Sequence, residues 1–233
     1  MKSDVQKETW KRPFSEPVAA VYQRPCFPEN PSSSASNERI PMSKTLASYW
    51  RFLLAGLINH VQTGAVVPSQ RFLVSKMIAP VPVDYDGTIV ELGAGTGALT
   101  VHLAARCPKA RVLACEINPV LARDIEDRLR TSGLEQRVQV ISDSAEHLLA
   151  SLRRQGTRPP DFVISGIPLG NLDRETVLTL VRSIRATLSK GGMYIQFQHS
   201  TVDRKKIKVT FSKLRTVPVL LNFPPAVIYY AVK

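Results

Sequence analysis

Five apolar runs of strand type alternate with four helical segments between residues 88 and 197. Continuous runs rich in β-branched residues, separated by helices, are typical of a parallel sheet that is covered on both faces. This alternation therefore predicts an α/β fold. The expected strands are Thr88–Leu92, Arg111–Cys115, Val138–Ile141, Phe162–Ser165 and Met193–Phe197, and the expected helices are about 98–106, 118–131, 145–154 and 173–189.

The end of the chain follows a different pattern. Two apolar runs, Arg215–Leu221 and Ala226–Val232, are joined only by Asn222-Phe-Pro-Pro225. This connection is too short for a crossover helix, so the two runs should form an antiparallel pair. The sequence thus predicts a seven-stranded sheet that is mostly parallel and ends in an antiparallel strand pair.

The first part of the chain divides into a tail and N-terminal helices. Residues 1–45 hold six of the 17 prolines and a Ser-rich run, without sustained periodicity, which predicts a disordered tail. Apolar residues at helical spacing predict an amphipathic helix over 46–58, and a second helix is expected at about 69–78. We expect one folded domain over 46–233.

The net charge of +12 indicates an anionic partner, either nucleic acid or an acidic membrane surface, with solubility alone as the other reading. The tail contributes seven basic and five acidic residues, or +2, which leaves +10 on the folded domain. The three cysteines show no metal-ligand spacing, and the chain opens without a signal-peptide pattern. These features predict a cytoplasmic protein without a metal site.

A glycine-rich loop follows the first expected strand, and acidic residues stand at the ends of three strands. The loop reads Gly93-Ala94-Gly95-Thr96-Gly97, and glycines there let the backbone approach a ligand closely. Glu91 precedes the loop, and its carboxylate suits an ammonium group rather than a pyrophosphate. Glu116 stands where ribose hydroxyls are held, and Asp143 can accept from an adenine amine.

Two alternatives compete with a nucleoside site. Gly93, Gly95 and Ala98 also satisfy a variant of the dinucleotide fingerprint. Asp143 and Asn118 are also suitable caps for the helices that follow them. Capping does not explain Glu91.

These residues together resemble the motifs of class I S-adenosylmethionine-dependent methyltransferases, which have a Rossmann-like seven-stranded sheet. The resemblance covers about residues 60–233 and implies S-adenosylmethionine as cofactor. It implies that Glu91 and the glycine loop hold the methionine moiety and that Glu116 holds the ribose. The full set of expected cofactor contacts is Ser69, Glu91, Gly93, Ala94, Gly95, Gly97, Glu116, Ile117, Asp143 and Ser144.

The loop after the fourth strand bears on the methyl acceptor. In adenine N6-methyltransferases, which resemble this chain in the sheet, a polar residue there accepts from the exocyclic amine and an aromatic residue stacks on the flipped base. This chain has Ser165 and Leu169 at those places. The loss of the stacking platform is worth about 1–3 kcal/mol and counts against RNA, which remains the alternative substrate.

The chain more closely resembles bacterial phospholipid N-methyltransferases, which act on phosphatidylethanolamine, and the related ornithine lipid N-methyltransferases. The shared features are a segment like 64–73, a Ser-Gly-Leu/Ile-Pro loop matched by Ser165–Pro168, and an ending like Asn222–Pro225. At Gln70 that family more often has Ser. The resemblance implies N-methylation of the amine headgroup of a membrane lipid.

Three residues are expected in catalysis. Ser165 and Gly166 should position the amine through the hydroxyl and backbone carbonyls. A protonated amine must first lose a proton, and His199 is the candidate acceptor, with nearby acidic groups and water as alternatives.

Two segments are expected at an anionic membrane surface. The helix over 46–58 carries Tyr49 and Trp50, which suit the interface, although it could also pack on the sheet. The segment 204–215 adds six basic residues that suit lipid phosphates, RNA phosphates or simple solvation. We therefore expect a cytoplasmic enzyme at the inner face of the membrane.

Overall fold

The computed structural model describes residues 68–220 and 225–233. The expected tail over 1–45, the helix over 46–58, residues 64–67 and residues 222–224 lie outside the described residues. Predictions for those segments stay predictions.

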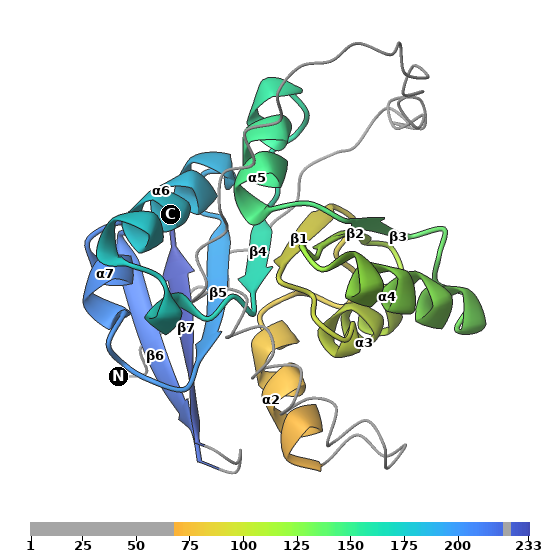
Figure 1. The fold of residues 1–233 in the computed structure, drawn as a ribbon, viewed down its shortest axis with the longest axis horizontal. Helices are drawn as coiled ribbons and strands as arrows, with labels where there is room; N and C mark the ends of the chain where they lie inside the picture. Colours follow the sequence, from red (N-terminus) through yellow and green to blue (C-terminus); the bar gives the residue numbers. More distant parts are fainter. Residues whose placement is uncertain (1–67, 221–224) are drawn as a thin grey trace, which may run out of the picture. The chain divides into compact units, whose positions relative to one another are not determined.

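The described residues form one seven-stranded sheet with the order β3-β2-β1-β4-β5-β7-β6 (Figure 1). The first five strands in chain order pair in parallel, whereas β7 pairs antiparallel with both β5 and β6. This confirms the predicted mostly parallel sheet with an antiparallel C-terminal pair. The strands are β1 (Thr88–Leu92), β2 (Arg111–Cys115), β3 (Val138–Ile141), β4 (Phe162–Ser165), β5 (Met193–Gln198), β6 (Lys213–Val219) and β7 (Ala226–Val232).

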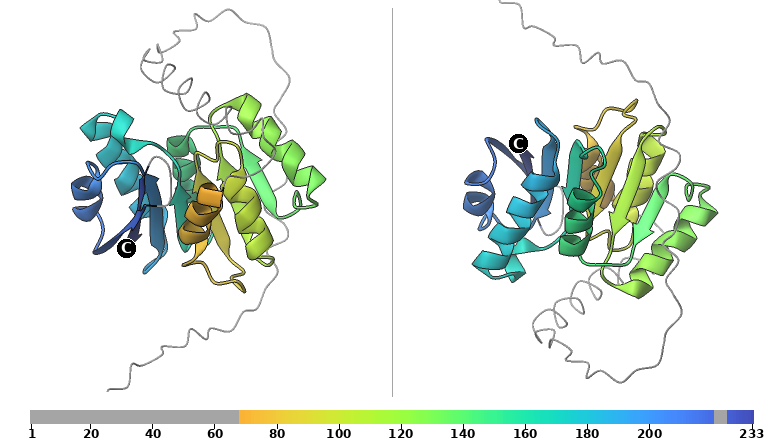
Figure 2. Two further views of the ribbon diagram at one scale, coloured as in Figure 1. Left: turned by 90° about the horizontal axis from the view of Figure 1, so that it is seen from below. Right: turned by 90° about the horizontal axis from the view of Figure 1, so that it is seen from above.

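Helices lie on both faces of the sheet (Figure 2), and each face has its own apolar core. One core contains side chains of α2, α3 and α4, and the other contains side chains of α5, α6 and α7. Central strands therefore read as unbroken buried runs, because both of their faces are covered. The helices are α2 (Pro68–Ile78), α3 (Ala98–Arg106), α4 (Pro119–Thr131), α5 (Ala145–Arg154), the short η1 (Leu169–Asn171), α6 (Arg174–Thr187) and α7 (Arg204–Lys208).

The strand at the β6 edge differs from the sequence-based expectation. It covers Lys213–Val219 rather than 215–221. Residues along β6 alternate in exposure, as expected for an edge strand with one covered face. The charged Lys213 and Arg215 are exposed, so they do not prevent β6 from pairing with β7. The part of the basic segment before it forms α7, whose Ile207 is buried on the α5–α6–α7 side.

Candidate functional site

The glycine loop connects β1 to α3 and is fixed by the backbone of β2. The amides of Gly93 and Ala94 both donate to the Cys115 carbonyl, at 2.9 and 3.0 Å. Gly97 precedes α3 with φ of 76°, and a Cβ there would lie 2.9 Å from Cγ1 of Ile125 on α4. Only glycine combines this φ with this close approach. The loop is therefore held in one conformation between the end of β1 and the first turn of α3.

Glu91 is a buried acid beside this loop. Its side chain is 1% exposed, and its Oε2 has no hydrogen-bond partner among the described residues. Burial raises the pKa of Glu91 to about 8; the Thr100 side chain opposes this shift and the Glu116 charge adds to it. A buried carboxyl with an unpartnered oxygen is the group that an ammonium ligand would satisfy.

Glu116 is fully buried at the end of β2, and the backbone holds both of its oxygens. Oε2 accepts from the Gly95 amide at 2.7 Å, and Oε1 accepts from the Asn118 amide at 2.9 Å. Burial raises the pKa of Glu116, and these backbone donors oppose that shift. Each carboxylate oxygen keeps a further lone pair, so ribose hydroxyls can still donate to it.

The residues expected around adenine lie at the ends of β2 and β3. Ile117 is 44% exposed, which leaves an apolar surface free to cover a ring. Asp143 Oδ1 accepts from the Ser144 amide at 2.6 Å and lies 3.1 Å from Nδ1 of His147. The cap of α5 is Ser144, whose Oγ accepts from the His147 amide, so Asp143 is not needed as a cap.

The capping alternative does hold at α4. Asn118 Oδ1 accepts from the Val120 amide at 2.9 Å and from the Leu121 amide at 3.5 Å. Ser69 lies in the first turn of α2. The roles assigned to these residues in cofactor binding stay predictions.

The loop after β4 turns its serine inward. Ser165 is fully buried, and its Oγ accepts from the Ile167 amide at 3.2 Å. Gly166 is exposed, and its amide donates to the Leu92 carbonyl at 2.9 Å. A Cβ at Gly166 would lie 3.0 Å from the Gly93 carbonyl oxygen, so the loop after β4 lies directly against the glycine loop.

Sequence reasoning missed two buried glutamines that hold this loop. Nε2 of Gln196 and Nε2 of Gln198 both donate to the Ile167 carbonyl, each at 2.9 Å. The Tyr194 hydroxyl donates to Oε1 of Gln196, which orients that amide. The signal was present, because Tyr194, Gln196 and Gln198 alternate along a central strand where apolar residues are the rule.

His199 follows β5 and is exposed. Its Nδ1 lies 3.1 Å from the Pro225 carbonyl, and its ring packs edge-on against Phe197 at 4.8 Å between centroids. A carbonyl oxygen only accepts, so Nδ1 carries a proton and Nε2 holds the lone pair when the ring is neutral. Nε2 is thus the nitrogen that can take a proton.

Comparisons with known proteins agree with this geometry. Residues 89–192 match the family model described as a methyltransferase domain. An ornithine lipid N-methyltransferase of Singulisphaera acidiphila is 28% identical over 168 residues, covering 71% of this chain and 86% of the relative. A probable dimethyladenosine transferase of Drosophila melanogaster is 27% identical over 86 residues, covering 37% of this chain and only 28% of the relative.

The fold has the same kind of neighbour among solved structures. A SAM-dependent methyltransferase from Agrobacterium tumefaciens aligns with a TM-score of 0.58 and 15% identity, covering 72% of this chain and 63% of that one. The unpartnered Glu91 oxygen and the glycine loop fit S-adenosylmethionine as the methyl donor. Together these matches support an S-adenosylmethionine-dependent methyltransferase, with the methyltransferase domain over residues 89–192.

Proposed function

We propose that this enzyme methylates the amine headgroup of a membrane lipid, either phosphatidylethanolamine or an ornithine lipid. The observation that carries the proposal is the loop after β4. Leu169 is fully buried in the core, and Ser165 is buried with its hydroxyl bonded to the Ile167 amide. The loop has no aromatic side chain on which a base could stack. It does expose backbone at Gly166, which a small amine could contact.

The relative named as an ornithine lipid N-methyltransferase supports the same acceptor, because its match extends over most of both chains. The match to the dimethyladenosine transferase covers little more than a third of this chain. RNA adenine methylation is therefore the second candidate, and it is the one that a buried Leu169 disfavours.

Each group has a defined task in the proposed reaction. S-adenosylmethionine supplies an electrophilic methyl group on a sulfonium centre when it is bound. Glu91 and the glycine loop would hold its methionine moiety, and Glu116 would hold its ribose. The loop at Ser165–Gly166 places the amine nitrogen for in-line attack, since positioning supplies most of the rate in such a transfer.

The amine must lose a proton before it can attack, because a primary ammonium has no lone pair. His199 is the proposed acceptor through Nε2. Its neighbours Pro225 and Phe197 fix the ring orientation at the carboxyl end of β5. Such a positioned base contributes about 10²–10⁴-fold in typical enzymes.

The proposal also places the enzyme at an anionic membrane surface. No helix within residues 68–220 and 225–233 is long and apolar enough to cross a bilayer. We propose a peripheral contact. The test of the whole proposal is transfer of labelled methyl groups to aminolipid vesicles, with ribosomal RNA as the competing acceptor.

A further inference from the structure

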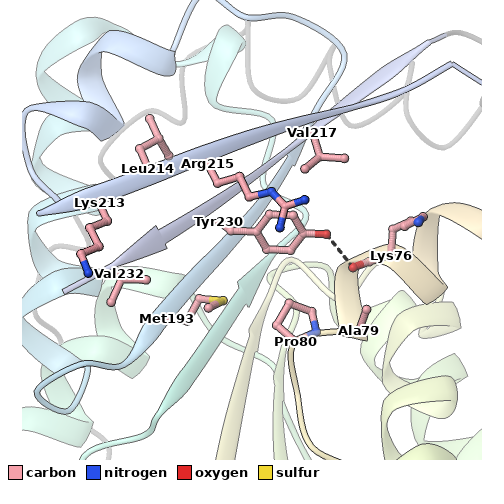
Figure 3. Close-up of a pocket in the computed structure, with 10 residues that line it drawn as sticks. All are labelled: Lys76, Ala79, Pro80, Met193, Lys213, Leu214, Arg215, Val217, Tyr230 and Val232. Carbon is pink, nitrogen blue, oxygen red and sulfur yellow. Dashed lines mark hydrogen bonds between the residues drawn. The ribbon is translucent and has the colours of Figure 1, made fainter. Parts of the chain in front are cut away.

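A groove of about 640 Å³ lies on the sheet face that also carries α2, over the β6 edge (Figure 3). Its floor is apolar, and three basic side chains stand around it. No acidic residue is among those that line it within the described part of the chain. The basic residues are Lys76, Lys213 and Arg215, and the apolar ones include Met193, Val217 and Val232.

The basic side chains are not neutralised by carboxylates. Lys76, Lys213 and Arg215 are all exposed, and none of them takes part in an ion pair among the described residues. The Lys76 ammonium lies 5.3 Å from the ring centroid of Phe72, itself 37% exposed. A phosphate at this groove would therefore meet uncompensated positive charge next to exposed apolar surface.

The wall between α2 and β7 is fixed. The Tyr230 hydroxyl donates to the Lys76 carbonyl at 2.7 Å, which ties the last strand to the end of α2 (Figure 3). The Arg215 side chain lies beside the Tyr230 ring in the same view. The groove is thus formed by packed elements of the domain.

The structure also divides the basic segment that the sequence presented as one. Lys213 and Arg215 lie on the groove side of β6, as does Val217. Lys205 and Lys208 belong to α7, which packs through Ile207 against the opposite face of the sheet. Four basic residues lie in α7 and two at the groove, so charge alone does not favour the groove; what the groove adds is an apolar floor.

From this combination we infer that the groove binds an anionic phospholipid, with the phosphate between the basic side chains and the apolar part on the floor. The charges around the groove complement such a lipid, and the volume falls in the range of small-molecule sites. The inference goes beyond the proposed methyl acceptor and concerns a second lipid.

The second lipid must be a different molecule from the one that is methylated. β5 and β7 separate Ser165 on β4 from Arg215 on β6, which amounts to three inter-strand spacings, or ~14 Å. In an ethanolamine headgroup, four bonds join the amine nitrogen to the phosphorus, which allows at most ~6 Å. We therefore assign a phosphate held at Arg215 to a second lipid and not to the one whose amine is at Gly166.

The test measures binding of the full chain to phosphatidylcholine vesicles with and without phosphatidylglycerol, an anionic lipid without an amine to methylate. The test variant is Lys213→Glu/Arg215→Glu, and the matched control is Lys205→Glu/Lys208→Glu, which changes the net charge equally. We expect the groove variant to bind phosphatidylglycerol vesicles at least tenfold more weakly, since two contacts become repulsive. The control should stay within about threefold of the wild type.

A third variant tests the floor. Val217→Ser keeps every charge and should also weaken binding, because it removes apolar contact without changing the field. Unchanged S-adenosylmethionine affinity in all variants shows that the fold is retained. Equal weakening in both charge variants would mean general attraction to the surface, and no weakening in the groove variant would mean that something else covers the groove; either result overturns the inference.

This outcome is separate from the outcome for the proposed function. Binding to phosphatidylglycerol requires no methyl transfer, so the groove result holds even if no aminolipid is methylated. Conversely, an enzyme that methylates aminolipids but ignores the groove charges would retain its proposed function and lose this second site.

Discussion

The side-chain amide of Gln198 donates to the Ile167 carbonyl at 2.9 Å, which joins the end of β5 to the loop after β4. Gln196 donates to the same oxygen at the same distance. A carbonyl oxygen has two lone pairs, so Ile167 has no acceptor capacity left for a substrate amine. In the proposed reaction, the exposed Gly166 beside it would accept from the substrate amine.

Replacing Gln198 by Met should therefore impair catalysis more than cofactor binding. The variant keeps the volume and removes the donor, so the loop loses part of its anchoring. We expect kcat to fall by about tenfold or more, since small misplacements of a reacting group are costly, with the Kd for S-adenosylmethionine unchanged by calorimetry. Gln139→Met, on an exposed position of β3, is the matched control. An equal loss of cofactor affinity would show that Gln198 supports the fold generally.

Glu91→Gln should separate stability from cofactor binding. The pKa of Glu91 is raised to about 8 in the folded protein, so the folded state keeps a proton that the unfolded chain releases near pH 4.5. The free energy of unfolding therefore falls as pH rises from about 4.5 to 8, by at most ~1.4 kcal/mol per pH unit from this group. Glu91→Gln should lack this contribution and be the more stable protein at pH 8, as urea unfolding at several pH values would show.

The raised pKa of Glu91 also predicts how cofactor affinity depends on pH. An ammonium ligand binds the ionised carboxylate, so wild-type affinity for S-adenosylmethionine should increase between pH 6 and 8. Glu91→Gln should bind about 10–100-fold more weakly at pH 8, because a hydrogen bond to a charged group is worth about 1.5–3 kcal/mol, and its affinity should not rise over that range. Parallel pH dependences in the two proteins would remove Glu91 from the methionine site.

Glu116→Ala should weaken cofactor binding and also cost some stability. The change removes the proposed ribose acceptor and leaves the Gly95 and Asn118 amides without their partner, at about 1–3 kcal/mol for a buried unsatisfied group. We expect at least a tenfold loss of affinity by calorimetry. Asn118→Ala is the control, since losing the cap of α4 costs about 1 kcal/mol and leaves Glu116 in place. If affinity is unchanged in Glu116→Ala, the ribose assignment is wrong.

His199→Ala should slow methyl transfer in a pH-dependent way. If Nε2 takes the proton from the amine, kcat near pH 7 should fall at least a hundredfold. The deficit should shrink at higher pH, where the amine loses its proton to solvent without help. Initial rates from pH 6 to 10 measure this. A small deficit that is constant over the range would assign proton removal to water.

The sheet was predictable in its order of elements because unbroken apolar runs between helices leave few alternatives. Every parallel strand begins where the sequence predicts, and β5 extends one residue further, to Gln198. The shift of β6 to Lys213–Val219 was not predictable from hydrophobicity, because an edge strand tolerates charged residues on its exposed face. α7 was missed because four of its five residues are basic and only Ile207 is buried, so the segment lacks the apolar periodicity of a helix.

The positions of the acids around the glycine loop were predictable because strand ends converge at one edge of a parallel sheet. Their environments were not. Sequence gives no means to see that Glu91 keeps an unpartnered oxygen, or that two backbone amides already occupy Glu116. The glutamine pair at Ile167 depends on side-chain rotamers across two strands, and spacing alone does not determine these.

A lipid amine is the proposed methyl acceptor. The most direct test incubates the full chain with methyl-labelled S-adenosylmethionine and vesicles that contain phosphatidylethanolamine or ornithine lipid, beside ribosomal RNA. We expect label in the lipid fraction, lost in Glu91→Gln at limiting cofactor, and none in RNA. Label in RNA with none in either lipid would contradict it.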